Sequence, residues 1–415
     1  MIGRKFVIGL AGTAVASVMA LSAHADSVRV AFIDPLSGPF AAVGTSGFHQ
    51  FQFATEQINA AGGVLGGKTF EMVPFDNKIS PKESLIQLKR VIGDGIQFIV
   101  QGNSSGVANA LTDAVRKNNE RNPDHRVLFL NYSAVDPALT NEKCNYWHFR
   151  FDANADMKMQ ALTDVIAKDK AMKKIYIIGQ DYSFGKAVAA AAVSMLGKKR
   201  PDIEIVGNEL HPIGKVKDFS PYIAKIKASG AQAVITGNWG ADMLNLQKAA
   251  NDAGLDVPFY TYYAAGNGIT AAIGAGGVGK VFLVHEGNNA NPIATDEWRA
   301  TSNAYKAKFP DDRDITQPRI FTAINMLAKA IDKAGSTEPA KVAAALEGMK
   351  YKTQWGDEDV MRASDHQLLM PVAISVHTDK GIEFDMDKSG YGLHVEHLVP
   401  RDAAAVGTTC KMKRP

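Results

Sequence analysis

Beyond residue 25, this 415-residue sequence has no long apolar run, no internal repeat and no low-complexity tract. Neither charge sign dominates, because apart from Arg4 and Lys5 the chain carries 44 basic and 43 acidic residues, evenly mixed. A basic face for nucleic acid or anionic lipid is therefore not expected. The remaining length, about 390 residues, is too large for one compact domain and suits two.

Catalytic and cofactor signatures are also missing. His285-Glu286 has no second histidine at the spacing of a zinc protease, and no serine lies in a nucleophile-elbow pattern. Residues 274–279 have the glycine spacing of a dinucleotide fingerprint, but they precede a predicted strand, whereas the fingerprint follows one. We therefore expect no enzyme activity, no cofactor and no metal.

The first 25 residues read as a secretory signal peptide. Arg4 and Lys5 precede an apolar run at 6–20, and Ala23-His24-Ala25 places small residues at the two positions that a signal peptidase reads. The run is short and rich in Gly, Ala and Ser, whereas a membrane anchor needs about 20 strongly apolar residues. The sequence predicts cleavage after Ala25 and a periplasmic product.

Cysteine is scarce, with Cys144 and Cys410 as the pair present. An even count in an exported chain favours a disulfide between them, which would attach the C-terminal tail to the middle of the chain. The alternative is two unpaired buried thiols. Two cysteines without histidine at ligand spacing make a poor zinc site.

Short apolar runs alternate with longer amphipathic segments along most of the chain. Such strands, each followed by a helix, are typical of a parallel sheet covered on both faces. About ten such units exceed one ordinary sheet, so we expect two doubly wound, Rossmann-like α/β lobes with a ligand cleft between them. The predicted strands are 28–33, 70–75, 98–100, 127–131, 175–178, 203–206, 233–236, 259–263 and 281–285. The predicted helices are 47–60, 81–92, 107–118, 157–168, 186–196, 241–253, 295–309 and 318–333.

The last region differs, with strands predicted at 372–377, 381–385 and 393–399 and a hairpin signal at 379–381. Asp385, Asp387 and Ser389, with Glu396 at the twelfth position, also match the spacing of a calcium loop. The flanks of this segment read as strands instead of helices, and a turn between strands uses the same residue types. Calcium binding therefore stays an open alternative to a plain turn.

Polar residues follow the strand at 98–100 and precede a helix. Ser104 and Ser105 lie in this turn, next to Asn103. Unpaired backbone N–H groups and the helix dipole favour an anion at a helix start, and two hydroxyls add donors. The turn predicts a carboxylate-binding site, although one serine alone would suffice as a helix cap.

Aromatic residues recur where predicted strands end. Rings at a cleft supply flat apolar walls with polar rims, so we expect the group to line the ligand site. A single ring of this kind belongs more often to the core. The aromatic candidates are Tyr132, Tyr182, Phe184, Trp239, Tyr262 and Tyr263.

Several segments together resemble the leucine/isoleucine/valine-type periplasmic binding proteins of ABC transporters. The resemblance covers nearly the whole mature chain in consistent order. It is carried by residues 30–39 (VAFIDPLSGP), 58–64 (INAAGGV), 181–185 (DYSFG), 218–220 (DFS) and 248–254. It implies the type I periplasmic binding protein fold, in which two discontinuous lobes are joined by three crossings and close around a ligand.

The resemblance also implies a domain division and site residues. The signal peptide is 1–25, the first lobe 26–149 plus 285–360, and the second lobe 150–284 plus 361–415. The carboxylate-binding turn falls on Ser104 and Ser105, a further contact falls at 133–135, and the closing rings fall on Phe184 and Trp239. The full predicted set is Asn103, Ser104, Ser105, Tyr132, Ser133, Val135, Tyr182, Phe184, Trp239 and Tyr263.

One position departs from the family pattern. Tyr263 stands at or beside the acidic residue that pairs with an amino acid's ammonium group. A buried ammonium needs a carboxylate, and tyrosine does not neutralise it. Asp152, Asp156 and Asp181 are the alternative acids. The class of the ligand therefore stays open: it is an amino acid, an aromatic or aliphatic acid, or an amide.

The expected partners are this small molecule and the permease subunits of an ABC importer at the inner membrane. We expect a monomer that binds no nucleic acid. The competing function is a soluble periplasmic sensor that presents its solute to a membrane receptor. A receptor ectodomain would need a second membrane segment, and a cytoplasmic regulator would lack the signal peptide.

Overall fold

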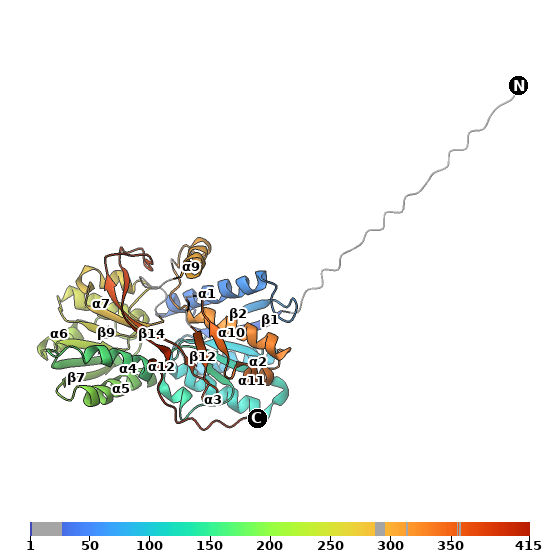
Figure 1. Cartoon of the computed structure of the whole chain (residues 1–415), viewed down its shortest axis with the longest axis horizontal. Coiled ribbons are helices and arrows are strands. Elements are labelled where there is room, and N and C mark those ends of the chain that lie inside the picture. The colour runs from blue at the N-terminus through green and yellow to red at the C-terminus, as the bar shows by residue number, and fades with distance from the viewer. Residues whose placement is uncertain (2–26, 287–294, 313, 355, 357) are drawn as a thin grey trace.

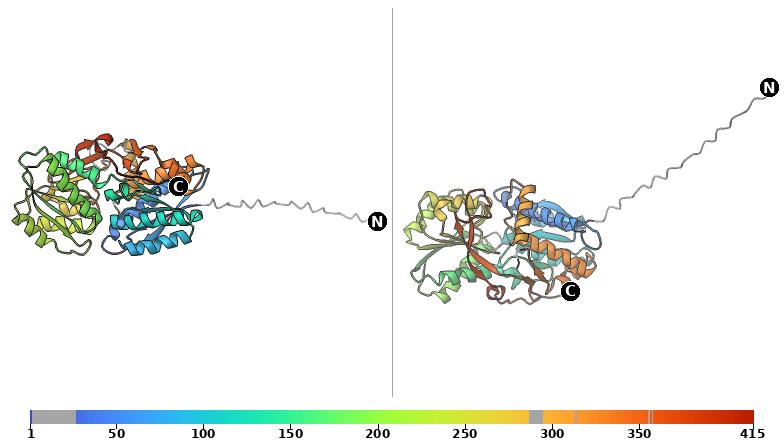
Figure 2. Two further views of the ribbon diagram at one scale, coloured as in Figure 1. Left: turned by 90° about the horizontal axis from the view of Figure 1, so that it is seen from below. Right: turned by 45° about the horizontal axis from the view of Figure 1, so that its top comes forward.

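The computed structural model describes residue 1 and residues 27–286, 295–312, 314–354, 356 and 358–415. The predicted signal peptide, apart from Met1, lies outside this part. The described chain forms two α/β lobes side by side, one mainly blue, cyan and orange and the other green, yellow and red (Figure 1). The same two lobes lie side by side in both views of Figure 2.

The first lobe is built on a five-stranded parallel sheet of order β2-β1-β3-β4-β5. Every residue of β3 and β4 is buried, and the first three residues of each strand are apolar. The strands are β1 (Val28–Asp34), β2 (Phe70–Asp76), β3 (Phe98–Gln101), β4 (Leu128–Asn131) and β5 (His148–Arg150). The helices are α1 (Ala41–Ala60), α2 (Pro81–Gly93), α3 (Ser105–Arg121), α9 (Asp296–Lys308), α10 (Arg319–Ala334) and α11 (Pro339–Leu346), with short 3₁₀ turns η1 (Pro123–His125) and η2 (Pro137–Thr140).

The second lobe is built on a seven-stranded sheet of order β15-β14-β10-β9-β8-β6-β7. Five of its strands pair in parallel, and β14 and β15 are added antiparallel at one edge. The strands are β6 (Lys174–Gln180), β7 (Glu204–His211), β8 (Ala233–Thr236), β9 (Phe259–Thr261), β10 (Val281–His285), β14 (Val372–Thr378) and β15 (Gly392–Val399). The helices are α4 (Ala155–Ile166), α5 (Ser183–Lys199), α6 (Ser220–Ala228), α7 (Gly240–Asp252) and α8 (Ile269–Ile273), followed by η3 (Ala275–Gly277).

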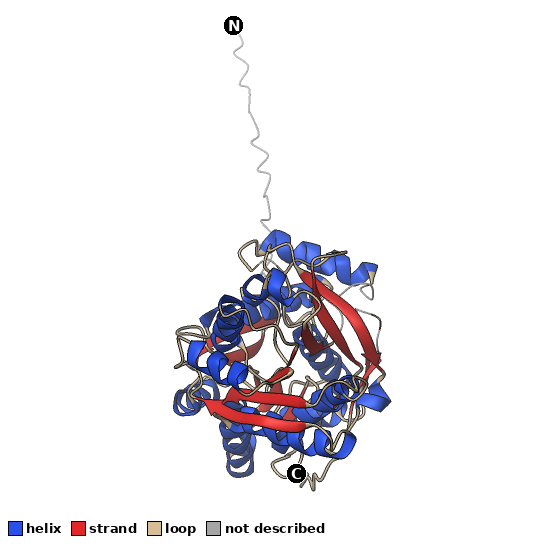
Figure 3. Cartoon of the chain, turned by 90° about the vertical axis from the view of Figure 1, so that its left-hand side faces the viewer, coloured by secondary structure: helices blue, strands red, loops and turns tan. Residues whose placement is uncertain are grey.

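Seen along the line that joins the two lobes, most helices lie at the periphery of the molecule (Figure 3). This is the doubly wound architecture that the alternating pattern predicts, and it is confirmed. The chain passes from the first sheet to the second after β5. After β10 it returns to the first lobe, where α10 packs against α1. It joins the second sheet again at β14, after a small sheet of β11 (Lys350–Lys352), β12 (Glu358–Met361) and β13 (Leu368–Leu369). Among the described residues, no helix combines the length and apolar character that a membrane span requires.

The C-terminal tail lies against the first lobe. After β15 and the short α12 (Arg401–Ala404), Cys410 forms a disulfide with Cys144, with their Cα atoms 5.8 Å apart. Close by, the Thr408 hydroxyl donates to the Thr140 carbonyl at 2.7 Å. The tail is thus held to a segment 266 residues earlier in the chain.

One predicted strand is wrong. Residues 381–385 form no strand, and β14 pairs with β15 across a connection of irregular structure. The Asp385 carboxylate accepts bonds from the Ser389 and Gly390 N–H groups, which bends this segment into a turn. The carboxylate of Asp387 accepts bonds from the Gly268 and Thr270 N–H groups, so the two aspartates of the calcium-like pattern both bind backbone.

Candidate functional site

A cavity of about 100 Å³ lies where loops that follow the strands of both sheets face one another. Nine of the ten predicted site residues line it. The first lobe contributes Asn103, Ser104, Ser105, Ser133 and Val135, and the second contributes Tyr182, Phe184, Trp239 and Tyr263. Parallel strands bring their carboxyl ends to one edge, which is why residues far apart in sequence gather here.

The turn that contains Ser104 and Ser105, which we call the serine turn, leads into the N-terminus of α3. Ser104 precedes the helix with φ 78° and ψ 111°, and its hydroxyl does not cap the helix that follows. Gly102 is required because a Cβ there would come within 2.7 Å of the Tyr132 ring. The first helical turn, Ser-Gly-Val-Ala, contains no acidic side chain. The turn therefore presents backbone N–H groups and a hydroxyl to the cavity, a suitable arrangement for an anion.

Tyr132 was predicted to line the site, but it does not line the cavity. It is fully buried, and its hydroxyl donates to Asp34 at 2.5 Å and accepts a bond from Asn103 Nδ2 at 3.0 Å. Its ring packs edge-on against Phe51, with centroids 5.1 Å apart. Tyr132 therefore supports the serine turn from beneath instead of meeting a ligand.

Aromatic rings form the wall that faces the serine turn. The Trp239 indole N–H donates to the Tyr182 hydroxyl at 2.8 Å, which fixes both rings. Phe184 packs next to Tyr263 with centroids 6.0 Å apart. Phe40, at the start of α1 in the first lobe, contacts Trp239 with a centroid distance of 4.3 Å. The two lobes therefore touch at this ring pair.

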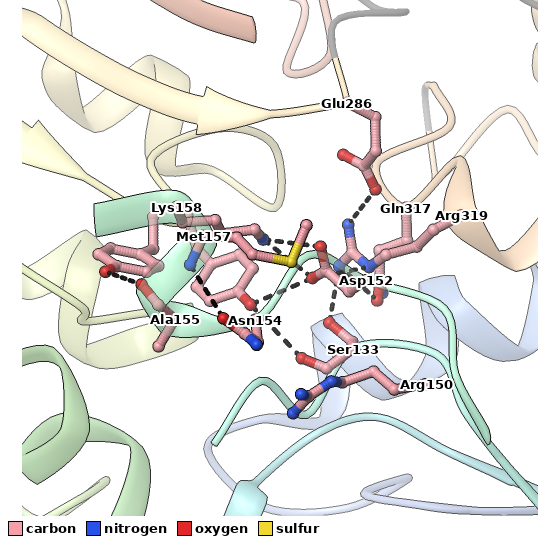
Figure 4. Close-up of polar contacts among 12 residues, drawn as sticks. Ser133, Arg150, Asp152, Asn154, Ala155, Met157, Lys158, Glu286, Gln317 and Arg319 are labelled. Atoms are coloured by element: carbon pink, nitrogen blue, oxygen red, sulfur yellow. Dashed lines mark hydrogen bonds and ion pairs between the residues drawn. The ribbon is translucent and has the colours of Figure 1, made fainter. Parts of the chain in front are cut away.

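Four buried charged side chains form one network beside the cavity (Figure 4). Lys158 Nζ lies 2.8 Å from Asp152 Oδ1, and Arg319 Nη1 lies 2.8 Å from Glu286 Oε1. Arg319 Nε lies 3.4 Å from Asp152 Oδ2, which joins the two pairs. Each of the four is at least nine-tenths buried. Two cations and two carboxylates make this network, which we call the four-ion cluster, neutral overall.

Neighbouring groups complete the cluster. Arg319 Nη2 donates to the Ser133 hydroxyl at 2.7 Å, and the Tyr263 hydroxyl donates to Asp152 Oδ2 at 3.3 Å. Burial raises the pKa of Glu286, but the charges of Arg319 and Lys158 outweigh this effect and hold that pKa at about 2. Burial lowers the pKa of Arg319, and the two carboxylates more than reverse the effect. Glu286 and Arg319 are therefore both charged at neutral pH.

Three charged residues that the sequence did not predict also line the cavity: Lys158, Glu286 and Arg319. The sequence contained one signal for Lys158, which is a lysine between two apolar residues, Met157 and Met159. Both methionines are buried in α4. Of the alternative acids, Asp152 belongs to the four-ion cluster. Asp181 is exposed and pairs with Lys186 at 3.0 Å, and Asp156 does not line the cavity.

Comparison with known proteins agrees with this geometry. Residues 27–381 match the family model described as "Periplasmic binding protein". The chain is 33% identical to "Leu/Ile/Val-binding protein homolog 4" of Brucella abortus (strain 2308), over 98% of each chain. The structure resembles the closed conformation of the leucine-, isoleucine-, valine-, threonine- and alanine-binding protein from Brucella ovis, with TM-score 0.82 and 31% identity over 94% of this chain and all of that one.

A more distant likeness shows the same fold. A solute-binding protein of an ABC transporter from R. palustris, solved in complex with benzoate, superposes with TM-score 0.79 at 17% identity, over 93% of this chain and 99% of that one. The family match spans most of the chain, and the full-length identity to a Leu/Ile/Val-binding homologue is 33%. The chain therefore belongs to the Leu/Ile/Val-binding type of the periplasmic binding protein family, whose members bind solutes and are not enzymes.

Proposed function

We propose that this protein is the periplasmic solute-binding component of an ABC importer and that it captures a small carboxylate-bearing molecule between its lobes. The observation that carries the proposal is the uncapped start of α3, where Ser104 and Ser105 face a cavity walled by Tyr182, Phe184 and Trp239. A carboxylate would receive bonds from the hydroxyls and the helix N–H groups, and the rings would cover its apolar part.

Closure of the lobes would complete the site. The ligand would touch the serine turn in one lobe and the rings in the other, so it would favour the closed state. The Phe40–Trp239 contact supports this view because it joins the first lobe to a ring of the wall in the second lobe. We propose that the closed form is the one that permease subunits recognise.

The four-ion cluster would meet the other end of the ligand. Lys158 is directed to the Asp152 carboxylate, and Arg319 is shared among Glu286, Ser133 and Asp152. Glu286 gives one oxygen to Arg319, and its other oxygen points away from that bond (Figure 4). Glu286 is therefore our candidate for the carboxylate that Tyr263 does not supply, and it would accept a bond from an ammonium or a hydroxyl group.

A thermal-shift panel on the mature protein, refolded to remove carried-over ligand, tests the proposal. The panel pairs L-leucine and L-phenylalanine with their deaminated acids and their amides, and adds benzoate. A ligand at 100 times its dissociation constant adds about 2.7 kcal/mol to the unfolding free energy. We expect the free acids to stabilise the protein and the amides to fail. An amide that stabilises as well as its acid would contradict the carboxylate-binding role of the serine turn.

The same panel identifies the second polar group. If amino acids bind and their deaminated partners do not, Glu286→Gln should remove the preference. If deaminated or aromatic acids bind best, the ligand has no ammonium group and Tyr263 marks the change in specificity.

Replacing Trp239 with alanine should weaken binding of the best panel ligand by about 2 kcal/mol, or roughly 30-fold, because a desolvated ring anchor is lost. Isothermal titration calorimetry measures the change. Trp239→Phe keeps a ring against Phe40 and serves as the control, with a smaller expected loss. Unchanged affinity in the alanine variant would assign this ring to the core.

A further inference from the structure

Asp34, the last residue of β1, is a fully buried carboxylate beneath the serine turn. Its Oδ2 accepts a bond from the Gly102 N–H and its Oδ1 accepts one from the Asn103 N–H, both at 3.0 Å. The Tyr132 hydroxyl donates a third bond at 2.5 Å. Asp34 thereby fixes the two residues that immediately precede Ser104 and sets the direction in which the turn enters α3.

The turn therefore serves two carboxylates. The N–H groups of Gly102 and Asn103 are occupied by Asp34, and the next two residues, Ser104 and Ser105, line the cavity. Under the proposed function a ligand carboxylate binds the latter set, only a few residues away. Two like charges inside a protein disfavour each other's ionised form.

Other charges around Asp34 do not remove this conflict. Among the described residues the recorded bonds to Asp34 come from Gln101, Gly102, Asn103 and Tyr132, and none of these donors is a cation. Asp76, its register partner on β2, is a further acid. Arg319, at the start of α10, acts on Tyr132, where its charge opposes the rise in pKa caused by burial and Asp34.

We propose that Asp34 is a positioning residue for the ligand's carboxylate and that binding is coupled to uptake of a proton by Asp34. The inference rests on the proposed function, because the ligand supplies the second carboxylate.

The titration of Asp34 supports the proposal. Burial raises the pKa of Asp34 to about 7 in the free protein, against the lowering effect of its hydrogen bonds. A nearby ligand carboxylate raises it further, so the complex holds more protons than the free protein. Affinity should therefore be highest at and below about pH 7 and should fall as the pH rises above that value. A rise of one pKa unit on binding would make this fall about tenfold.

Two measurements on the full mature chain test the proposal. The first is an NMR titration of the Gly102 and Asn103 amides in the free protein, whose midpoint should lie near pH 7. The second is calorimetry with L-leucine and benzoate as probes, in phosphate and in Tris. Proton uptake makes the binding heat differ between these buffers, because Tris releases its proton with a much larger enthalpy.

Three variants test whether the amide titration and the buffer dependence arise from Asp34. Asp34→Asn should remove both the amide titration and the buffer dependence. Asp76→Asn, a change to the neighbouring acid, should keep both. Tyr132→Phe should keep proton uptake and move the midpoint upward, because a bond that lowers the pKa of Asp34 is lost. This last variant keeps the proposal testable if Asp34→Asn folds poorly.

The outcomes separate the two proposals. If neither probe binds the wild-type protein but the amides titrate near pH 7, carboxylate binding by the serine turn and the coupling that rests on it both fail for these probes, whereas the titration of Asp34 in the free protein stands. If a probe binds with equal heats in both buffers, or if the buffer dependence survives in Asp34→Asn, the proton-coupled role of Asp34 is overturned.

Discussion

Replacing Arg319 with methionine should lower the free energy of unfolding by about 3–5 kcal/mol. Methionine keeps an apolar side chain of similar length but removes the charge that faces Glu286 and Asp152. Glu286 would then be left as a buried carboxylate without its closest cation, because Lys158 is directed to Asp152 at 2.8 Å. The Ser133 hydroxyl would also lose its bond. Urea unfolding of the ligand-free protein measures this change.

Arg299→Met is the matched control, since Arg299 pairs with Asp296 and Glu383 at the surface. Exposed pairs contribute about 0–1 kcal/mol, so this variant should unfold almost like the wild type. Adding Glu286→Leu to Arg319→Met should recover a large part of the loss, because the uncompensated charge is removed. A loss below about 1 kcal/mol in Arg319→Met would contradict a desolvated four-ion cluster.

Strands made almost wholly of apolar residues are visible in the sequence. Residues 233–236 and 281–285 were predicted with the bounds that the structure shows for β8 and β10. β8 is buried at every residue and β10 at three of its five residues. Their apolar runs report burial within the sheet, which is a local property. The same reasoning predicts the two doubly wound lobes, because each buried strand needs a covering helix.

Strands made of polar residues are not visible in this way. β5, His148–Arg150, was missed although its residues are buried. Arg150 Nε donates to Gln367 Oε1 at 2.7 Å, and Arg150 Nη1 donates to the Asp136 carbonyl at 2.6 Å. Gln367 is 217 residues away, so the group that allows Arg150 to be buried is absent from the local pattern.

The residues of the candidate site also divide into those that the local sequence predicts and those that depend on distant partners. The serine turn and the rings follow predicted strands directly, so their place at the edge of the sheets is predictable from sequence. The four-ion cluster depends on Arg319, which meets Glu286 across 33 residues and Ser133 across 186. No spacing rule links such partners. Tyr132 shows the reverse error, because a ring at a strand end pointed into the core.

The double variant Ser104→Ala with Ser105→Ala should weaken binding of the best panel acid by at least about 100-fold. Each hydrogen bond to a charged group contributes about 1.5–3 kcal/mol, and two would be lost. The backbone N–H groups of α3 remain, so the helix start would still attract an anion weakly. Calorimetry on each variant measures the loss.

The structure separates the two serines by their effect on stability. Ser104 does not cap α3, so Ser104→Ala alone should leave the unfolding free energy nearly unchanged while affinity falls. The Ser105 hydroxyl accepts a bond from the Asp136 N–H at 3.2 Å, so Ser105→Ala should also cost about 1 kcal/mol of stability. Ser84→Ala is the control, since Ser84 is buried in α2 and donates to the Ser80 carbonyl at 2.8 Å. Full affinity in Ser104→Ala would place the ligand's carboxylate elsewhere in the cavity, and Arg319 and Lys158 would then be the cations to replace.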